Sequence, residues 1–272
     1  MNMKKISFVF LVVALFSVFS DTASADHSWG SYHWARIANP LVLKLGDNVS
    51  SVWDTYLSQA SSDWSASLAL DTAVVTGQSS QKNCRPTAGR VEVCNNKYGN
   101  NGWLGIAQIW VNESHITQTV TKVNDTYFSR VPYNTAAWKQ FVVCQEIGHA
   151  FGLDHQDENF SNINLGTCMD YTNDPNGLIK NQLSNEHPNQ HDYDELGIIY
   201  THFDSFTSAL SSVFNKKTSA SASVDGNDDN TDTSDKKEWG REMRKSNDGR
   251  SSFHERDLGK GNKVFTFVIW AE

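Results

Sequence analysis

The chain has 272 residues, of which 39% are hydrophobic and 20% are charged, and its formal net charge is −8 at neutral pH. This length and composition suit a globular protein with one sizeable core, and they exclude collagen-like, coiled-coil and wholly disordered chains. The acidic balance has the wrong sign for binding nucleic acid or an anionic membrane, so we expect no nucleic-acid partner.

The first 25 residues have the layout of a secretory signal peptide. Lys4 and Lys5 form a short basic region, residues 6–20 are apolar, and residues 23–25 (Ala-Ser-Ala) provide a cleavage site. A membrane anchor is the alternative, but this apolar run is shorter than the roughly 20 residues that span a bilayer. We therefore predict a secreted, extracellular monomer with no stable membrane anchor after signal removal.

Residues 26–206 have the pattern of one globular domain. Aromatic residues at 29, 32 and 34 alternate with small or polar residues and predict a first strand. Apolar residues at helical spacing predict a helix up to Trp64, capped by Asp47 or Asn48. Turn-forming clusters then separate strands predicted over residues 68–75, 90–94 and 104–111.

Two further helices and a tail complete the chain. A helix is predicted to begin at Asn134 or Thr135 and to stop at Gly152, and another covers residues 191–202. Residues 207–238 have the composition of a flexible polar linker. Residues 239–272 form a tail that ends in a strand-forming run over residues 264–270. That strand either joins the sheet of the main domain or pairs with a partner.

Export would place the four cysteines in an oxidising compartment, where disulfides are stable. Four cysteines allow three pairings. We predict that Cys84 and Cys94 close a local loop and that Cys144 is bonded to Cys168. Four free, buried thiols are the alternative.

The segment Gln145–His155 (QEIGHAFGLDH) carries the chemistry. On a helix, Gln145 and His149 lie one above the other on one face, close enough to share a metal ion. Glu146 stands beside that face, where its carboxylate could accept a proton from an activated water. Because His155 is too far along for a straight helix, the chain must turn back, and Gly152 allows this because glycine adopts positive φ cheaply. Three donors from one side would leave a position open for water, as a catalytic metal requires.

This segment resembles the motif of the metzincin clan of zinc metallopeptidases, which includes the matrixins and astacins: H-E-x-x-H-x-x-G-x-x-H followed by a methionine turn. Glu146, His149, Gly152 and His155 match the motif, and residues 166–171 (GTCMDY) resemble the methionine turn around Met169. The resemblance implies an α+β metzincin-like catalytic domain: a twisted mixed β-sheet, a motif-bearing active-site helix, a Met-turn and a C-terminal helix. It covers roughly residues 29–205.

The resemblance implies a secreted zinc-dependent endopeptidase that hydrolyses internal peptide bonds of an extracellular protein or peptide substrate. Zinc would activate a water, Glu146 would be the general base, and Tyr171 would contact the metal or the oxyanion. The strand over residues 104–111 would hold the substrate backbone by β-pairing. Calcium is a possible second ion, since four acidic residues surround the motif. These residues are Asp154, Asp157, Glu158 and Asp170.

Gln145 departs from the family pattern, which has a histidine ligand at this position. A neutral carboxamide oxygen is a weaker zinc donor than imidazole. Gln145 is a true ligand in one reading, and in a second reading Tyr171, His187 or His191 completes the shell. In a third reading the site is catalytically inactive. The rival function is therefore an inactive secreted metal- or peptide-binding module on the same fold.

Overall fold

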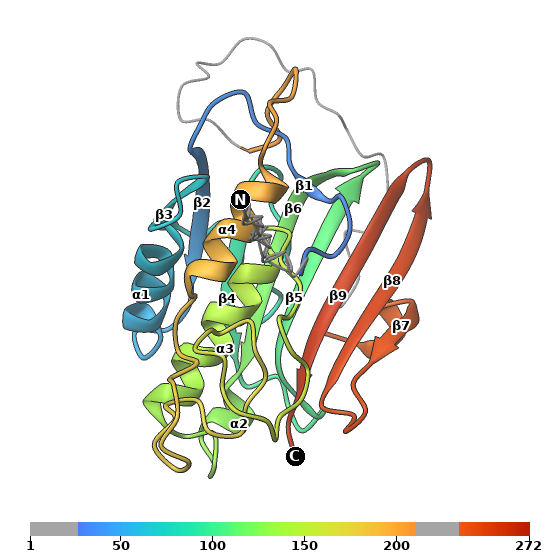
Figure 1. Cartoon of the computed structure of the whole chain (residues 1–272). Helices are drawn as coiled ribbons and strands as arrows, with labels where there is room; N and C mark the ends of the chain where they lie inside the picture. Colours follow the sequence, from blue (N-terminus) through green and yellow to red (C-terminus); the bar gives the residue numbers. More distant parts are fainter. Residues whose placement is uncertain (1–26, 210–233) are drawn as a thin grey trace, which may run out of the picture.

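The computed structural model describes residues 27–209 and 234–272, which form a mixed β-sheet with helices packed against it (Figure 1). The predicted signal peptide and residues 210–233 of the predicted linker lie outside the described residues. The helices are α1 (Asp54–Trp64), α2 (Asp125–Phe128), α3 (Ala136–His149), α4 (Gln190–Ile199) and the short 3-10 helix η1 (Lys236–Glu238). The strands are β1 (His33–Trp34), β2 (Leu41–Asn48), β3 (Leu70–Thr76), β4 (Val91–Asn96), β5 (Trp103–Asn112), β6 (His115–Asn124), β7 (Arg241–Lys245), β8 (Ser251–Gly259) and β9 (Asn262–Trp270).

The strands follow the order β3-β2-β4-β6-β5-β9-β8-β7 across the sheet, and β1 pairs with β6. The strands β3, β2, β4 and β6 are parallel, whereas β5, β9, β8 and β7 continue the sheet in antiparallel pairs. The C-terminal strand therefore joins the sheet of the main domain, which is the first of the two alternatives that the sequence left open. Helices α1, α3 and α4 lie on one face of this sheet (Figure 1).

The predicted helices are present, but one predicted cap is wrong. Asn48 is the last residue of β2, and its side-chain amide donates to Glu92 Oε2 at 2.5 Å, so α1 begins only at Asp54. The helix α3 has the predicted cap, because Thr135 Oγ1 accepts from the backbone N–H of Trp138 at 3.2 Å. The expected first strand is reduced to the two residues of β1.

Four strands, β2, β6, β7 and β8, have no counterpart in the sequence prediction, and two of them lie in the main domain. The strand β2 buries Leu41, Leu43 and Leu45 at alternate positions, as a half-buried strand should. The strand β6 combines threonines with buried apolar residues, and its Thr119 and Thr121 are themselves fully buried. Because β6 lies between β4 and β5, both of its edges are satisfied by backbone pairing and its polar side chains do not mark it as a surface strand.

Buried tryptophans from β1 and α1 hold α3 in place. Trp34 Nε1 donates to the carbonyl of Ala150 at 2.8 Å, and Trp64 Nε1 donates to the carbonyl of Cys144 at 3.2 Å. Both indole rings are fully buried, so each hydrogen bond satisfies a donor that water cannot reach. The two predicted disulfides are present, and the described residues contain no free cysteine. In the described part of the chain, we find no helix of sufficient length and apolarity to cross a membrane.

Candidate functional site

The C-terminal half of α3 buries three of the predicted site residues. Gln145, Glu146 and His149 are each at most 1% exposed. The helix lies so close to β5 that a Cβ at Gly105 would stand 2.6 Å from Glu146 Oε1 and 2.6 Å from a methyl group of Val142. Glycine at position 105 therefore lets the Glu146 carboxyl lie directly against the sheet.

The turn after α3 brings His155 to His149, as the sequence predicts. Gly152 has φ +103°, a left-handed conformation that side-chain-bearing residues avoid, and a Cβ there would stand 2.8 Å from the carbonyl oxygen of Tyr32. The imidazole centroids of His149 and His155 lie 4.5 Å apart with their planes at 89°. Two histidines that lie six residues apart in the chain thus meet edge to face.

Hydrogen bonds fix which nitrogen of each imidazole carries a proton. His149 Nδ1 lies 2.8 Å from the carbonyl oxygen of Leu153, which only accepts, so Nδ1 must be the donor. His155 Nδ1 lies 3.1 Å from Glu158 Oε1, which assigns the proton to Nδ1 there as well. In the neutral tautomers, Nε2 of both rings then carries a lone pair. Such outer hydrogen bonds orient histidine ligands in metal sites.

Several buried polar atoms at this place lack partners. Gln145 Oε1, Glu146 Oε2 and His155 Nε2 have no hydrogen-bond partner among the described residues. Unpaired buried polar atoms are rare in proteins, because each loses its hydration without compensation. A cation would satisfy the amide oxygen and the imidazole nitrogen, so the donor set fits a divalent metal such as zinc.

Burial sets the protonation of the site. It raises the pKa of the Glu146 carboxyl well above its usual range, so this carboxyl holds a proton more tightly than an exposed glutamate does. Burial and the neighbouring His155 lower the pKa of His149 well below its usual range, so this imidazole stays neutral and able to bind a metal. Burial also raises the pKa of the Tyr171 phenol well above its usual range, which keeps the hydroxyl protonated.

The segment around Met169 lies beneath α3. A Cβ at Gly148 would stand 2.5 Å from Met169 Sδ, so the thioether is in contact with the helix one residue before His149. Gln145 Nε2 donates to the carbonyl of Cys168 at 3.0 Å, and the Cys144–Cys168 disulfide ties the two segments covalently. The amide of Gln145 is therefore oriented by its nitrogen, which leaves its oxygen unpaired.

Tyr171, His187 and His191, the alternative ligands, differ in their position relative to the motif histidines. The ring of Tyr171 lies 4.4 Å from that of His155, centroid to centroid. By contrast, His187 Nδ1 is paired with Asp63 at 2.7 Å, and His191 stacks on His27. Of the three residues proposed to complete the shell, only Tyr171 has a recorded contact with the motif histidines.

The calcium hypothesis finds no support in the geometry. Arg244 Nη1 donates to Asp154 Oδ2 at 2.8 Å, and Arg244 Nε lies 3.1 Å from Glu158 Oε1. Burial alone would raise the pKa of the Asp154 carboxyl, but the hydrogen bonds from Arg244 and the charges of Arg244, His155 and His149 together outweigh it and the pKa is lowered. A guanidinium therefore occupies two of the four carboxylates that we expected around a calcium ion.

The strand β5, which the resemblance assigns to substrate binding by β-pairing, has no free edge in the described chain, because it lies between β6 and β9. The strand β9 pairs with β5 along its length, with Phe267 opposite Ala107. The ring of Phe267 stacks on His149 with the centroids 4.1 Å apart and the planes at 10°. The sequence shows that residues 264–270 form a strand, but nothing in it marks Phe267 or Arg244 as neighbours of the motif.

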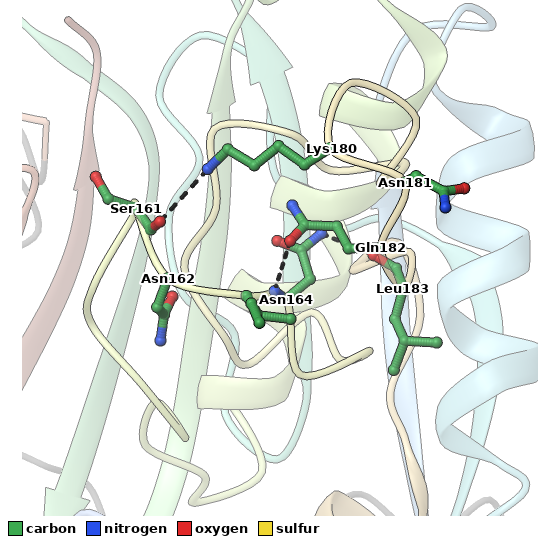
Figure 2. Close-up of a pocket in the computed structure, with 8 residues that line it drawn as sticks. Ser161, Asn162, Asn164, Lys180, Asn181, Gln182 and Leu183 are labelled. Carbon is green, nitrogen blue, oxygen red and sulfur yellow. Dashed lines mark hydrogen bonds between the residues drawn. The ribbon is translucent and has the colours of Figure 1, made fainter.

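A separate hollow lies between residues 161–164 and residues 180–183 (Figure 2). Lys180 Nζ donates to the carbonyl of Ser161 at 3.4 Å across it, and Asn164 N donates to Gln182 Oε1 at 3.1 Å. No histidine, cysteine, aspartate or glutamate is among its described lining residues. It therefore offers no imidazole, thiolate or carboxylate for metal binding or general-base chemistry, unlike the histidine pair on and after α3.

No family model and no curated protein matches this sequence. Among solved structures, the chain is similar to high choriolytic enzyme 1, a hatching enzyme zinc-protease from Oryzias latipes (medaka fish), with 12% identity and a TM-score of 0.33 over 64% of this chain and 96% of that chain. It is also similar to myroilysin, with 13% identity and a TM-score of 0.32 over 66% of this chain and 96% of that chain. Similarity at this level carries no functional argument, which must come from the residues themselves.

Proposed function

We propose that this chain is a secreted zinc-dependent endopeptidase, with His149, His155 and Gln145 as the metal ligands. The observation that carries the proposal is the set of buried, unpaired donor atoms on Gln145 and His155, next to a His149 that is fixed by Leu153 in the tautomer a metal needs. The two disulfides agree with an oxidising, extracellular location.

The residues of this chain divide the reaction between them. Bound zinc would supply Lewis acidity, which polarises a water and the substrate carbonyl. Glu146 would accept the proton of the attacking water and return it to the leaving amine. Tyr171, whose raised pKa keeps its hydroxyl protonated, would donate a hydrogen bond to the developing oxyanion.

Gln145 sets the strength of the site. Its carboxamide oxygen is neutral and is a weaker donor than imidazole, so zinc binding should be weaker than in a three-histidine site. The hydrogen bond from Gln145 Nε2 to the Cys168 carbonyl holds the amide in one orientation and offsets part of that loss.

The test compares zinc content and hydrolysis of an unfolded protein substrate, with and without chelator, in the wild type and in Glu146→Gln. We expect the variant to retain zinc and to lose hydrolysis by a factor of about 100 or more, because a general base contributes roughly this much. Glu113→Gln, on the exposed β5–β6 turn, is the matched control and should match the wild type. Hydrolysis that survives in Glu146→Gln contradicts the mechanism. Zinc binding without hydrolysis in the wild type, and also in Arg244→Ala, favours the binding-module alternative.

A further inference from the structure

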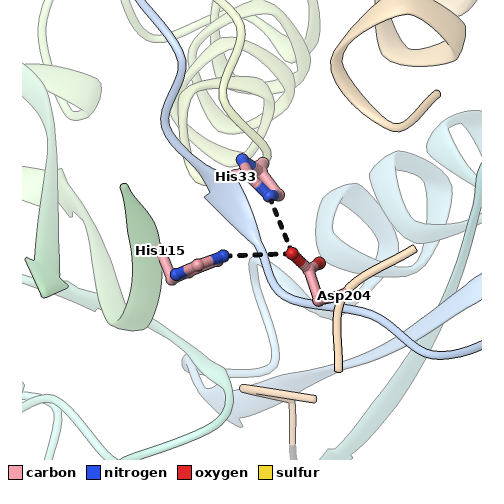
Figure 3. Close-up of side chains that lie close together, drawn as sticks. All are labelled: His33, His115 and Asp204. Carbon is pink, nitrogen blue, oxygen red and sulfur yellow. Dashed lines mark hydrogen bonds and ion pairs between the residues drawn. The ribbon is translucent and has the colours of Figure 1, made fainter. Parts of the chain in front are cut away.

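A second cluster of histidines lies outside the motif, where the start of the described chain meets the segment after α4. His33 of β1 and His115 of β6 approach Asp204 (Figure 3). Their Nε2 atoms lie 3.6 and 3.1 Å from Asp204 Oδ1. His202 Nε2 lies 3.6 Å from the same oxygen. Three imidazole nitrogens thus surround one carboxylate oxygen.

These separations match the edges of a metal tetrahedron. Zinc binds histidine nitrogen and carboxylate oxygen at about 2.0–2.2 Å, which sets neighbouring ligand atoms about 3.3–3.5 Å apart. The ligand atoms of His33, His115 and Asp204 all lie within 4.8 Å of one another. The imidazoles of His33 and His202 are also adjacent, with their centroids 4.7 Å apart.

The hydrogen bonds around the cluster turn its inner atoms toward one another. His115 Nε2 is hydrogen-bonded to Asp204 Oδ1 at 3.1 Å, through a proton that a metal ion would replace. His33 Nδ1 lies 2.8 Å from the carbonyl oxygen of Ser31 and must donate to it, so Nε2 of the neutral ring carries a lone pair. His33 is only 6% exposed, and its Nε2 has no hydrogen-bond partner among the described residues. Asp204 Oδ2 accepts from the backbone N–H of Arg36 at 2.8 Å, which turns Oδ1 toward the histidines. A buried lone pair facing a carboxylate is unfavourable unless a proton on the ring or a metal ion lies between them.

We propose that His33, His115, His202 and Asp204 form a second, structural zinc site. Four side-chain donors fill a tetrahedron, so no position would be left for a reacting water, unlike the open site at the motif. The ion would join β1, β6 and the segment after α4. These segments are otherwise held by hydrogen bonds such as Ala35 N to Ser208 Oγ at 2.9 Å. The donor set is rich in imidazole. Zinc binds imidazole well, whereas calcium and magnesium favour oxygen ligands.

The test measures zinc per chain, and the melting temperature of the metal-free full chain with and without added zinc. If both sites bind, the wild type should hold two zinc ions per chain and His115→Gln should hold one. His254→Gln replaces a buried histidine outside both clusters and is the matched control. Zinc should raise the melting temperature of metal-free His155→Gln, which retains the structural site, by several degrees.

The outcomes separate this site from the motif. If the motif site binds no zinc, the wild type should hold one ion, which His115→Gln loses and His155→Gln retains. That result supports the structural site although the peptidase proposal fails. Should His115→Gln fold poorly, the half-exposed His202→Gln must still weaken zinc binding about tenfold, as changes near a metal do. Unchanged zinc content and zinc affinity in both variants would mean that the cluster is only an ion-pair network, and would overturn the inference.

A second inference concerns the motif site and rests on the proposed function. The C-terminal segment, residues 234–272, covers that site from β5 outward. The strand β9 fills the edge of β5 that an extended substrate would need, running antiparallel to it. Phe267 stacks on His149, and Arg244 binds both Asp154 and Glu158, the latter also holding His155 Nδ1. Ser251 of β8 lies close enough to the Tyr171 side chain to influence the pKa of its phenol.

We infer that the C-terminal segment is inhibitory and occupies the place of the substrate. Each residue assigned to metal or oxyanion chemistry, except Gln145, is in contact with this segment or with one of its partners. Main-chain pairing with β5 is the interaction by which an extended peptide would bind, so the two occupants exclude each other. The full chain should therefore be a slow peptidase.

The test uses the full chain with Arg244→Ala, which removes the two ion pairs at a side chain that is 42% exposed. Hydrolysis, and the rate at which a chelator extracts the zinc that His155 binds, should both rise by a factor of up to about 5, which is what loss of a partly exposed ion pair gives. Arg241→Ala, on the exposed strand β7, is the control and should change neither rate. Phe267→Leu removes the ring stack at similar volume and should act in the same direction.

Zinc extraction tests coverage of the site by the C-terminal segment, whereas hydrolysis also tests the peptidase proposal. Faster zinc extraction without any hydrolysis supports coverage by the C-terminal segment and contradicts the peptidase proposal. If Arg244→Ala and Phe267→Leu both leave extraction and hydrolysis at the wild-type rates, the segment does not restrict the site and the inference is wrong.

Discussion

At the scale of single residues, the strength of the motif site depends on the atom that Gln145 presents. Replacing Gln145 by histidine exchanges a neutral amide oxygen for an imidazole nitrogen, and we expect zinc affinity to rise at least about tenfold. Competition with a chromophoric chelator measures this change. Gln190→His, on the exposed start of α4, should leave the affinity unaltered. An unaltered affinity in Gln145→His would mean that residue 145 lies outside the metal shell.

Asp170 makes stability depend on pH. It is fully buried, Oδ2 accepts from Leu165 N and Asn185 Nδ2, both at 2.8 Å, and Oδ1 has no partner in the described part of the chain. Burial raises the pKa of Asp170 from 3.8 to about 6. Because the folded protein holds this proton more tightly than the unfolded chain, the resulting stabilisation is complete below pH 3.8 and is lost as pH rises through 6.

Asp170→Asn should remove this pH dependence, since an amide oxygen can accept the same two hydrogen bonds and does not ionise. Urea unfolding at several pH values between about 4 and 7 should show a smaller fall in the free energy of unfolding than in the wild type, by up to about 3 kcal/mol. Asp194→Asn, on the exposed face of α4, controls for the loss of a carboxylate. Parallel curves for the wild type and Asp170→Asn would contradict the assigned pKa.

The sequence predicted the relative positions of residues that are close in the chain, because helix periodicity and turn-forming glycines determine them. Helical periodicity placed His149 relative to Gln145, and glycine chemistry placed His155 after the turn at Gly152. The sequence could not identify His33 and His115 as neighbours, because their meeting depends on the parallel pairing of β1 with β6. The stack of Phe267 on His149 likewise arises from the register between β5 and β9.

At the scale of elements, the turn after α3 is the device that gathers the motif. Gly152→Ala would force a side chain into a left-handed conformation and against the Tyr32 carbonyl, 2.8 Å away. We expect the free energy of unfolding to fall by about 2 kcal/mol or more and zinc affinity to drop as His155 moves. Denaturant unfolding and zinc titration measure the two effects.

Gly197→Ala is the matched control for that experiment. Gly197 lies within α4, and a Cβ there would meet nothing within 4 Å. Because alanine favours a helix over glycine by about 1 kcal/mol, this variant should be slightly more stable and should bind zinc as the wild type does. Equal stability losses in both variants would show that the conformation of residue 152 is not the cause.

The elements themselves were predictable in proportion to their local signals. The helix α3 has a cap at Thr135 and an apolar face, and its start follows from them, whereas it ends at His149, three residues before the predicted stop at Gly152. The strand β6 carries threonines and a fully buried Lys122, so polarity along the chain conceals a central strand. Its identity depends on the neighbours β4 and β5 that pair with it, which no local pattern reveals.

At the scale of the whole molecule, two parts of the chain contribute strands to one sheet. Residues 27–209 contribute the parallel strands and the helices on one face, whereas the C-terminal segment adds β9, β8 and β7 beyond β5. Phe265, Phe267 and Ile269 of β9 belong to the main hydrophobic core. The outermost strand β7, by contrast, is exposed at every residue.

This arrangement predicts that the C-terminal segment opens before the rest of the sheet. Separating it breaks one backbone ladder, β5 with β9, whereas opening β4 or β6 breaks ladders on both sides and uncovers the helices. Stability is distributed unevenly when such units differ in their contacts. Hydrogen exchange measured by mass spectrometry should therefore be faster in β8 and β9 than in β4 and β6. Arg244→Ala should accelerate exchange in β7, β8 and β9 but not in β4 and β6, because Arg244 of β7 attaches the C-terminal segment to Asp154 and Glu158. Uniform acceleration across all these strands would instead mean that the sheet opens as a single unit, and substrate could then reach β5 only when the whole domain unfolds.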